Sequence, residues 1–156
     1  MDDNDSVFVL SHKEIIMGVF VSRKIALEYL KKKYENAIVE TFPYTPSIIK
    51  VHFLCNDGKR IMTICFYLGE FPVVGEIKAD NSVYVLTHKN IIVGVFNSWE
   101  TAIICTKETY GKAEIVTDIY NSERFNVIFN DSTGHISVTI SFKLRRKIIQ
   151  KGENAQ

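Results

Sequence analysis

The chain has 156 residues, of which 46% are hydrophobic and 24% charged, and its net charge is +1. This length suits one domain or two very small ones, and it can bury a core without metals or disulfides. A nearly neutral chain has no overall field that selects nucleic acid or an anionic membrane. No apolar run approaches the ~20 residues that span a bilayer, so we expect no membrane partner.

The three cysteines are Cys55, Cys65 and Cys105. An odd number without a close CxxC pair argues against a disulfide framework or a zinc site, and we expect buried free thiols in a reducing compartment. The first residues, MDDNDS, are acidic and polar, unlike a signal peptide, so we expect a protein that is not secreted.

Residues 6–20, SVFVLSHKEIIMGVF, contain two apolar runs separated by a short polar break, which predicts a β-hairpin. Ser22 is placed to cap a helix over residues 23–35, in which Ala26 and Leu30 fall on one apolar stripe. A strand is predicted at 38–41. The next hairpin turns at NDGK, since Asp-Gly between apolar runs favours such a turn.

Residues 82–96, SVYVLTHKNIIVGVF, repeat residues 6–20 with 11 of 15 positions identical. The match continues without a gap at an offset of 76, so that 25 of the 63 residues in 6–68 are identical to those in 82–144. The second copy predicts a helix over 99–111 after Ser98, a strand at 114–119 and a final hairpin. The chain is therefore interpreted as a tandem duplication of one module.

The predicted fold class is α+β, in which each repeat is a β-β-α-β-β-β module with a mostly antiparallel sheet and one helix. The predicted organisation is a first repeat at 1–68, a linker at 69–81, a second repeat at 82–144 and a polar, basic tail at 145–156. The linker contains Pro72 and two glycines, with a short additional strand as the alternative. The first two strands of each repeat are apolar on both faces, which predicts two repeats packed as a pseudo-twofold dimer.

The last predicted strand alternates apolar and polar residues: Val138, Ile140, Phe142 and Leu144 on one face, with Thr139, Ser141 and Lys143 on the other. This pattern predicts one buried and one solvated face.

His12 and His88 are the histidines that both copies share. A symmetric pair could bind a partner, an anion or a metal, or sense pH. The more common role is a ring that bonds a backbone group beside a turn, because no further metal ligand lies at a suitable spacing. His52 and His135 are unmatched between the copies and are expected to pack or to lie at the surface.

The remaining motifs indicate no catalytic or ligand-binding site. Gly18 and Gly94 lack the further glycines and the lysine of a phosphate loop. Tyr67 and Tyr84 could stack on bases but lack the sequence motif that accompanies such aromatic residues. We therefore expect no cofactor, no metal, no catalytic residue and no small-molecule substrate.

The segment KLRRKIIQK, residues 143–151, has five basic residues and no acidic one. These candidate interaction residues are Lys143, Arg145, Arg146, Lys147 and Lys151. They could bind nucleic acid or an acidic partner, whereas the simpler reading is a solvated strand end with a frayed tail.

The combination of a hairpin, the string Gly-Val-Phe, a capping Ser and an early helical Ala resembles small β-β-α modules of phages and large DNA viruses. The residues that match are Gly18, Val19, Phe20, Ser22 and Ala26, with their counterparts Gly94, Val95, Phe96, Ser98 and Ala102. The resemblance implies no catalytic residues, and it implies a viral protein, located in the cytoplasm or in a virion.

The two copies share apolar and turn residues, whereas most of their polar residues differ. This pattern favours a non-enzymatic structural or protein–protein interaction protein, with itself, a larger assembly or another protein as partner. The alternative is a nucleic-acid-binding protein that uses residues 143–151.

Overall fold

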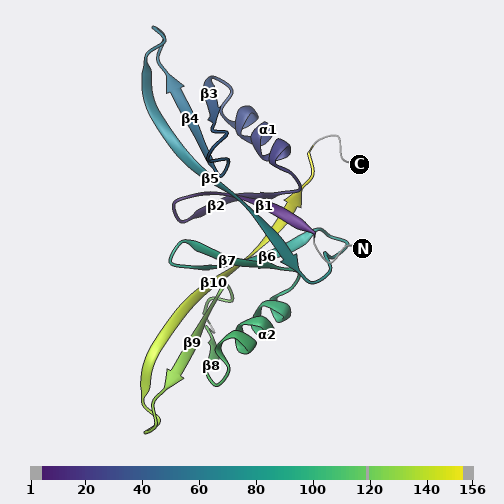
Figure 1. Ribbon diagram of the computed structural model, residues 1–156, viewed down its shortest axis with the longest axis vertical. Helices are drawn as coiled ribbons and strands as arrows, with labels where there is room; N and C mark the ends of the chain where they lie inside the picture. The colour runs from purple at the N-terminus through teal and green to yellow at the C-terminus, as the bar shows by residue number, and fades with distance from the viewer. Residues whose placement is uncertain (1–4, 119, 153–156) are drawn as a thin grey trace. The chain divides into compact units, whose positions relative to one another are not determined.

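The computed structural model describes residues 5–118 and 120–152, which form an α+β protein of ten strands and two helices (Figure 1). The chain divides into two compact units. The first unit contains residues 6–71 together with the chain from Ile149 onward, and the second contains Asp5 and residues 72–148. The α+β class predicted from the sequence is confirmed.

The first unit is one sheet with one helix. Its elements are β1 (Ser6–His12), β2 (Ile15–Phe20), α1 (Arg23–Lys33), β3 (Ala37–Thr41), β4 (Ile48–Leu54) and β5 (Arg60–Val74). The strand order is β2-β1-β5-β4-β3, and the β1–β2, β3–β4 and β4–β5 pairs are antiparallel. The end of β10 pairs with β2 in parallel, with Ile149 opposite Val19.

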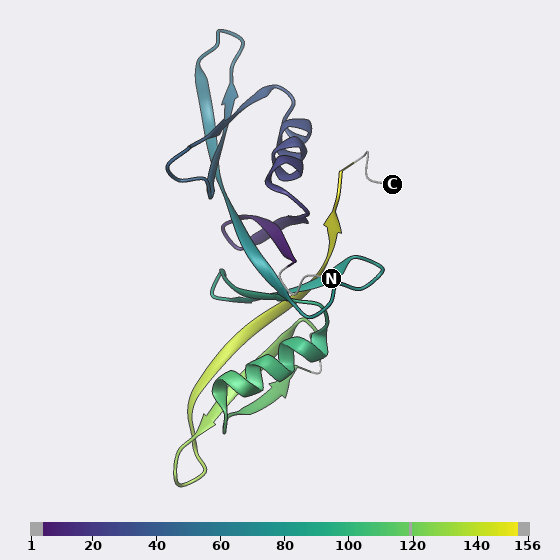
Figure 2. The ribbon, with the colours of Figure 1, turned by 45° about the vertical axis from the view of Figure 1, so that its right-hand side comes forward.

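The second unit has the same element order. Its elements are β6 (Ser82–His88), β7 (Ile91–Phe96), α2 (Trp99–Tyr110), β8 (Glu114–Thr117), β9 (Arg124–Asn130) and β10 (Ile136–Gln150). The strand order is β7-β6-β10-β9-β8, and Figure 2 shows α2 lying along one face of this sheet. The end of β5 pairs with β7 in parallel, with Val73 opposite Val95.

Both long strands continue past the ends that the sequence predicts. β5 runs six residues into the predicted linker, as far as Val74, and β10 runs six residues into the predicted tail, as far as Gln150. Pro72 lies inside β5, in contrast to its predicted role in a linker. The strands continue because their ends gain parallel partners that are distant in the sequence.

The predicted caps and turns form as expected. The Ser22 hydroxyl accepts a hydrogen bond from the Ile25 N–H at 3.2 Å, and the Ser98 hydroxyl accepts one from the Thr101 N–H at 3.1 Å. In the β6–β7 turn, Lys89 and Asn90 adopt positive φ angles of 48° and 69°. The local chemistry of these residues therefore sets the boundaries of the hairpin and both helices.

Each unit has its own core between the helix and one sheet face. The buried cluster of the first unit is Leu10, Phe20, Ala26, Leu30, Ile49, Val51, Phe66 and Leu68. The buried cluster of the second is Leu86, Phe96, Ala102, Ile103, Phe125, Val127, Phe142 and Leu144. Six of the eight members of the first cluster recur as identical residues 76 positions later.

The predicted buried face of β10 is only partly buried. Phe142 and Leu144 are buried, Ile140 is half-buried, and Val138 is 52% exposed. The reason is geometric, because the β9–β10 hairpin extends beyond α2, as the β4–β5 hairpin extends beyond α1 (Figure 1). Met62, the counterpart of Val138, is likewise 51% exposed.

The two capping serines provide a test of how far local signals stabilise the units. Replacing Ser22 or Ser98 by Ala removes the acceptor of a free helical N–H, and each change should lower the free energy of unfolding by about 1 kcal/mol. Urea denaturation measures the effect. Ser132→Ala in an exposed turn is the control, and equal losses in all three variants would contradict the capping role.

Candidate functional site

His12 and His88 make the same contacts in their respective units. His12 Nδ1 lies 3.0 Å from the Cys65 carbonyl oxygen, and His88 Nδ1 lies 2.9 Å from that of Ser141. A carbonyl only accepts, so Nδ1 donates and carries the proton in both rings. Each ring centroid also lies 5.4 Å from that of a core phenylalanine, Phe66 or Phe142. In each unit, these contacts hold the end of the first hairpin strand against the neighbouring long strand.

Among the described residues, no three His, Cys, Asp or Glu side chains are placed to hold a metal ion. Neither described helix is long and apolar enough to cross a membrane.

The basic segment is mainly a paired strand. Residues 143–148 of β10 pair with β6, and two of the candidate side chains lie beside acids. Arg146 Nη2 lies 3.2 Å from Asp80 Oδ2, and Arg145 Nε lies 3.9 Å from Glu123 Oε2. Lys143 and Lys147 are half-buried on the same strand, whereas Lys151 follows it and belongs to the first unit. The structure therefore does not present the five residues as one free basic tail.

The three cysteines differ in their exposure. All three are free thiols, as predicted, but Cys65 is exposed on the outer face of β5 and not buried. Burial, with a smaller contribution from the Glu108 carboxylate, raises the pKa of the Cys105 thiol above its ordinary value. A thiol with a raised pKa is protonated at neutral pH and is a poor nucleophile.

A row of polar side chains that the sequence did not predict crosses the outer face of the first unit's sheet. His52 Nε2 lies 2.8 Å from Glu40 Oε1, and His52 Nδ1 lies 2.8 Å from Thr63 Oγ1. A carboxylate only accepts, so Nε2 donates to Glu40. The second hydrogen bond joins Nδ1 and the Thr63 hydroxyl, either of which can be the donor. His52 is only 3% exposed, in agreement with its predicted packing role.

This polar row has the order hydroxyl, imidazole, carboxylate, which can move a proton away from Thr63. Neither of the two hollows described for this unit reaches these three residues. The second unit places Val116, Ile128 and Thr139 at the equivalent positions. Val116 and Ile128 therefore stand in place of Glu40 and His52, while the threonine is kept, and cross-strand packing accounts for both rows.

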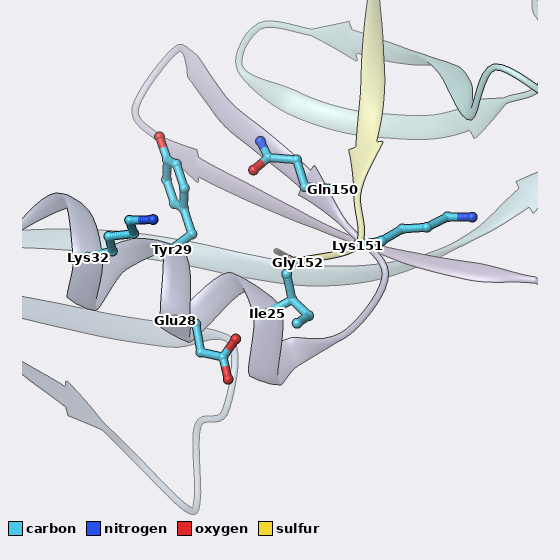
Figure 3. A pocket seen from close by; sticks show the side chains of 7 residues that line it. All are labelled: Ile25, Glu28, Tyr29, Lys32, Gln150, Lys151 and Gly152. Atoms are coloured by element: carbon cyan, nitrogen blue, oxygen red, sulfur yellow. The ribbon is translucent and has the colours of Figure 1, made fainter. Parts of the chain in front are cut away.

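A hollow of about 520 Å³ lies between α1 and the end of the C-terminal strand (Figure 3). Its lining residues are Ile25, Glu28, Tyr29, Lys32, Gln150, Lys151 and Gly152. Gly152 has a φ of +88°, and a Cβ atom there would lie 2.8 Å from Ile25 Cδ1. Glycine is therefore needed for the chain to turn against α1 at this point.

Sequence reasoning singled out Lys151 in this hollow but missed the residues of α1. The helical segment RKIALEYLKKK has five basic residues, which is the signal that could have identified it. No local pattern links Glu40, His52 and Thr63, because the three residues meet only through the register of three strands.

Several exposed apolar residues occupy equivalent positions in the two units. Ile15 and Ile91, which follow the tight turns, are 57% and 67% exposed. Tyr44 and Tyr120, in the loops between the third and fourth strands of each unit, are 97% and 93% exposed. Both pairs are identical residues, although neither loop nor turn requires an exposed Ile or Tyr.

The polar row can be tested by transplanting the second unit's residues. Glu40→Val should lower the free energy of unfolding by about 1–3 kcal/mol, since it leaves the buried His52 N–H without its acceptor. Glu40→Val combined with His52→Ile should recover most of the loss, because removing both partners is far cheaper than removing one. Urea denaturation measures the free energy of unfolding of both variants. A double variant that is less stable than Glu40→Val alone would contradict the pairing.

Asp80 provides a pH test. Hydrogen bonds from the Ser82 hydroxyl and N–H, and then the Arg146 guanidinium, hold the pKa of this carboxyl below its ordinary value. Such a group stabilises the fold above its unfolded-state pKa, and the contribution is lost as the pH falls through the lowered value. Ser82→Ala should raise the pKa of Asp80 more than Arg146→Ala does, as measured by NMR titration. The reverse order would show that the ion pair dominates.

Comparison of the chain with known protein families, with curated proteins and with solved structures gave no match. The function is therefore to be inferred from the residues of the two units alone.

Proposed function

We propose that the protein is a non-enzymatic protein–protein interaction protein whose two units arose by tandem duplication. The observation that carries this proposal is the exposure of identical apolar residues at equivalent positions, Ile15 with Ile91 and Tyr44 with Tyr120. Exposed tyrosines are among the residues that contribute most to protein interfaces. Burial in the unit's own core cannot explain why the same residues occur twice.

The duplication is supported by contacts that recur at an offset of 76 residues. The bulge in β1–β2 between Leu10 and Ser11 has its counterpart in β6–β7 between Leu86 and Thr87. The two histidine contacts and the two parallel strand ends recur at the same offset. The pseudo-twofold packing of the repeats stays a prediction.

The alternative, nucleic-acid binding through residues 143–151, receives less support. Arg145 and Arg146 lie beside Glu123 and Asp80, so two of the five charges are already partly neutralised. Affinity for nucleic acid depends on the number of phosphates that free cations neutralise.

The resemblance to viral modules makes a virion protein the first partner to test. Tagged protein should be purified from the cells in which it is naturally made, as wild type and as the variants Ile15→Ser/Ile91→Ser and Tyr44→Ser/Tyr120→Ser. We expect a stoichiometric protein partner with the wild type that is lost with both variants. These changes should cost little stability, because the side chains are exposed.

Ile104→Ser is the matched control, since Ile104 is 55% exposed but has Glu28 as its counterpart. The control should retain the partner. Equal loss with Ile104→Ser, or a lone monomer in every preparation, would contradict the proposal. Co-purified nucleic acid that high salt removes would favour the alternative.

A further inference from the structure

The helix α1 carries a larger positive charge than the equivalent helix of the second unit. Its five basic residues oppose only Glu28, giving a net charge of 5 − 1 = +4. The helix α2, in the equivalent place of the second unit, has one lysine and two glutamates, giving 1 − 2 = −1. Both helices pack on their sheets through the same alanine, Ala26 or Ala102. Lys31, Lys32 and Lys33 lie in the last turn, where positive charge is favourable, and Arg23 donates to the Pro46 carbonyl. The basic residue of α1 that the fold does not explain is Lys24.

In the first turn of α1, the positive charge of Lys24 opposes local stability. A helix N-terminus carries a partial positive charge, which favours acidic residues and disfavours basic ones. α1 has no acidic residue in its first turn, and Lys24 there is exposed. α2 has the favourable residue, Glu100, at the position equivalent to Lys24. Lys24 is thus explained by neither packing nor helix formation.

Two hollows lie along α1 and share Glu28. One is the hollow of Figure 3, where Tyr29 and Gln150 stand on one side and Lys151 extends away from the helix. The other, of about 490 Å³, is lined by Arg23, Lys24, Leu27, Glu28 and Lys31.

The linings of the two hollows together contain five cations and one carboxylate, a net charge of 5 − 1 = +4. Since the whole chain has +1, the other residues sum to 1 − 4 = −3. Positive charge is therefore concentrated on this face of the first unit, where it attracts an acidic ligand.

We infer that the exposed face of α1 with its two hollows, the α1 surface, docks an acidic segment of a protein partner that also carries apolar side chains. The carboxylates of such a segment complement the lysines. Its apolar side chains match Ile25, Leu27 and the ring of Tyr29, which are half-buried in the walls.

The carboxylate of Glu28 favours a protein segment over nucleic acid as the occupant of the α1 surface. It stands between the two hollows, where an occupant must meet its carboxylate. A peptide can place an uncharged residue with a backbone N–H donor there and its carboxylates at the lysines, whereas every nucleotide carries a phosphate, whose oxygens only accept. This surface is separate from the shared positions Ile15/Ile91 and Tyr44/Tyr120 and does not depend on their role.

The test uses the full chain and a short fluorescein-labelled peptide that alternates Glu and Leu, with binding followed by fluorescence anisotropy. Lys24→Glu/Lys31→Glu should weaken binding at least about tenfold, because it reverses two charges of the lining. Lys24→Glu also restores the favourable first-turn charge, so unfolding is not expected to cause the loss. Lys107→Glu, at the position equivalent to Lys31 in α2, is the matched control and should leave affinity within about twofold.

Three outcomes would overturn the inference: no binding by the wild type, an equal loss with Lys107→Glu, or unchanged binding of a peptide with Ser in place of Leu. Tighter binding of single-stranded oligo(dT), with the same loss in Lys24→Glu/Lys31→Glu, would identify nucleic acid as the occupant instead. Ile15→Ser/Ile91→Ser should bind the peptide like the wild type, which separates this inference from the proposed function.

Discussion

The packing of one short helix on one long sheet determines what each unit buries and what it exposes. α1 has 11 residues, which correspond to about 17 Å of helix, whereas β5 has 15 residues, or about 50 Å of strand. The helix can therefore cover only about a third of the strand. Phe66 lies under the helix and is buried, while Met62 lies beyond it on the same face and is half-exposed. The exposed hairpin ends follow from this difference in length.

The same constraint leaves the outward faces of the two units free to differ. Ala26 and Leu30 attach α1 to the sheet, so the residues on its other side do not affect packing. The polar row at His52 and the charge of α1 both lie on such free faces. The corresponding faces of the second unit carry Ile128 and Ile104. Two units with the same element order and different outer faces are therefore able to make different contacts.

The sequence predicted those features that are encoded locally. The hairpin apolar runs, the capping serines and the Asp-Gly turn each depend on a few adjacent residues. The ends of β5 and β10 were not predicted, because they depend on partners far along the chain. The glycines near Pro72, and Pro72 itself, are typical of a linker. Only the parallel pairing with β7 shows that β5 continues through this segment.

The candidate sites were predictable to different extents for the same reason. His12 and His88 were identified by the repeat, and their contacts with carbonyl oxygens agree with the role expected beside a turn. The basic segment was identified by composition, which does not reveal that Asp80 and Glu123 lie beside two of its arginines.

The charge of α1 was visible in the sequence, yet it gained meaning only by comparison with α2. Because the two helices occupy equivalent places, α2 shows what the fold alone needs from such a helix. The difference at Lys24, where α2 has Glu100, runs against helix stability, and it supports the inference that the α1 surface meets an acidic partner. The second unit thus serves as a comparison for the first, and the position at which α1 departs from the more stable choice is the one on which that inference depends.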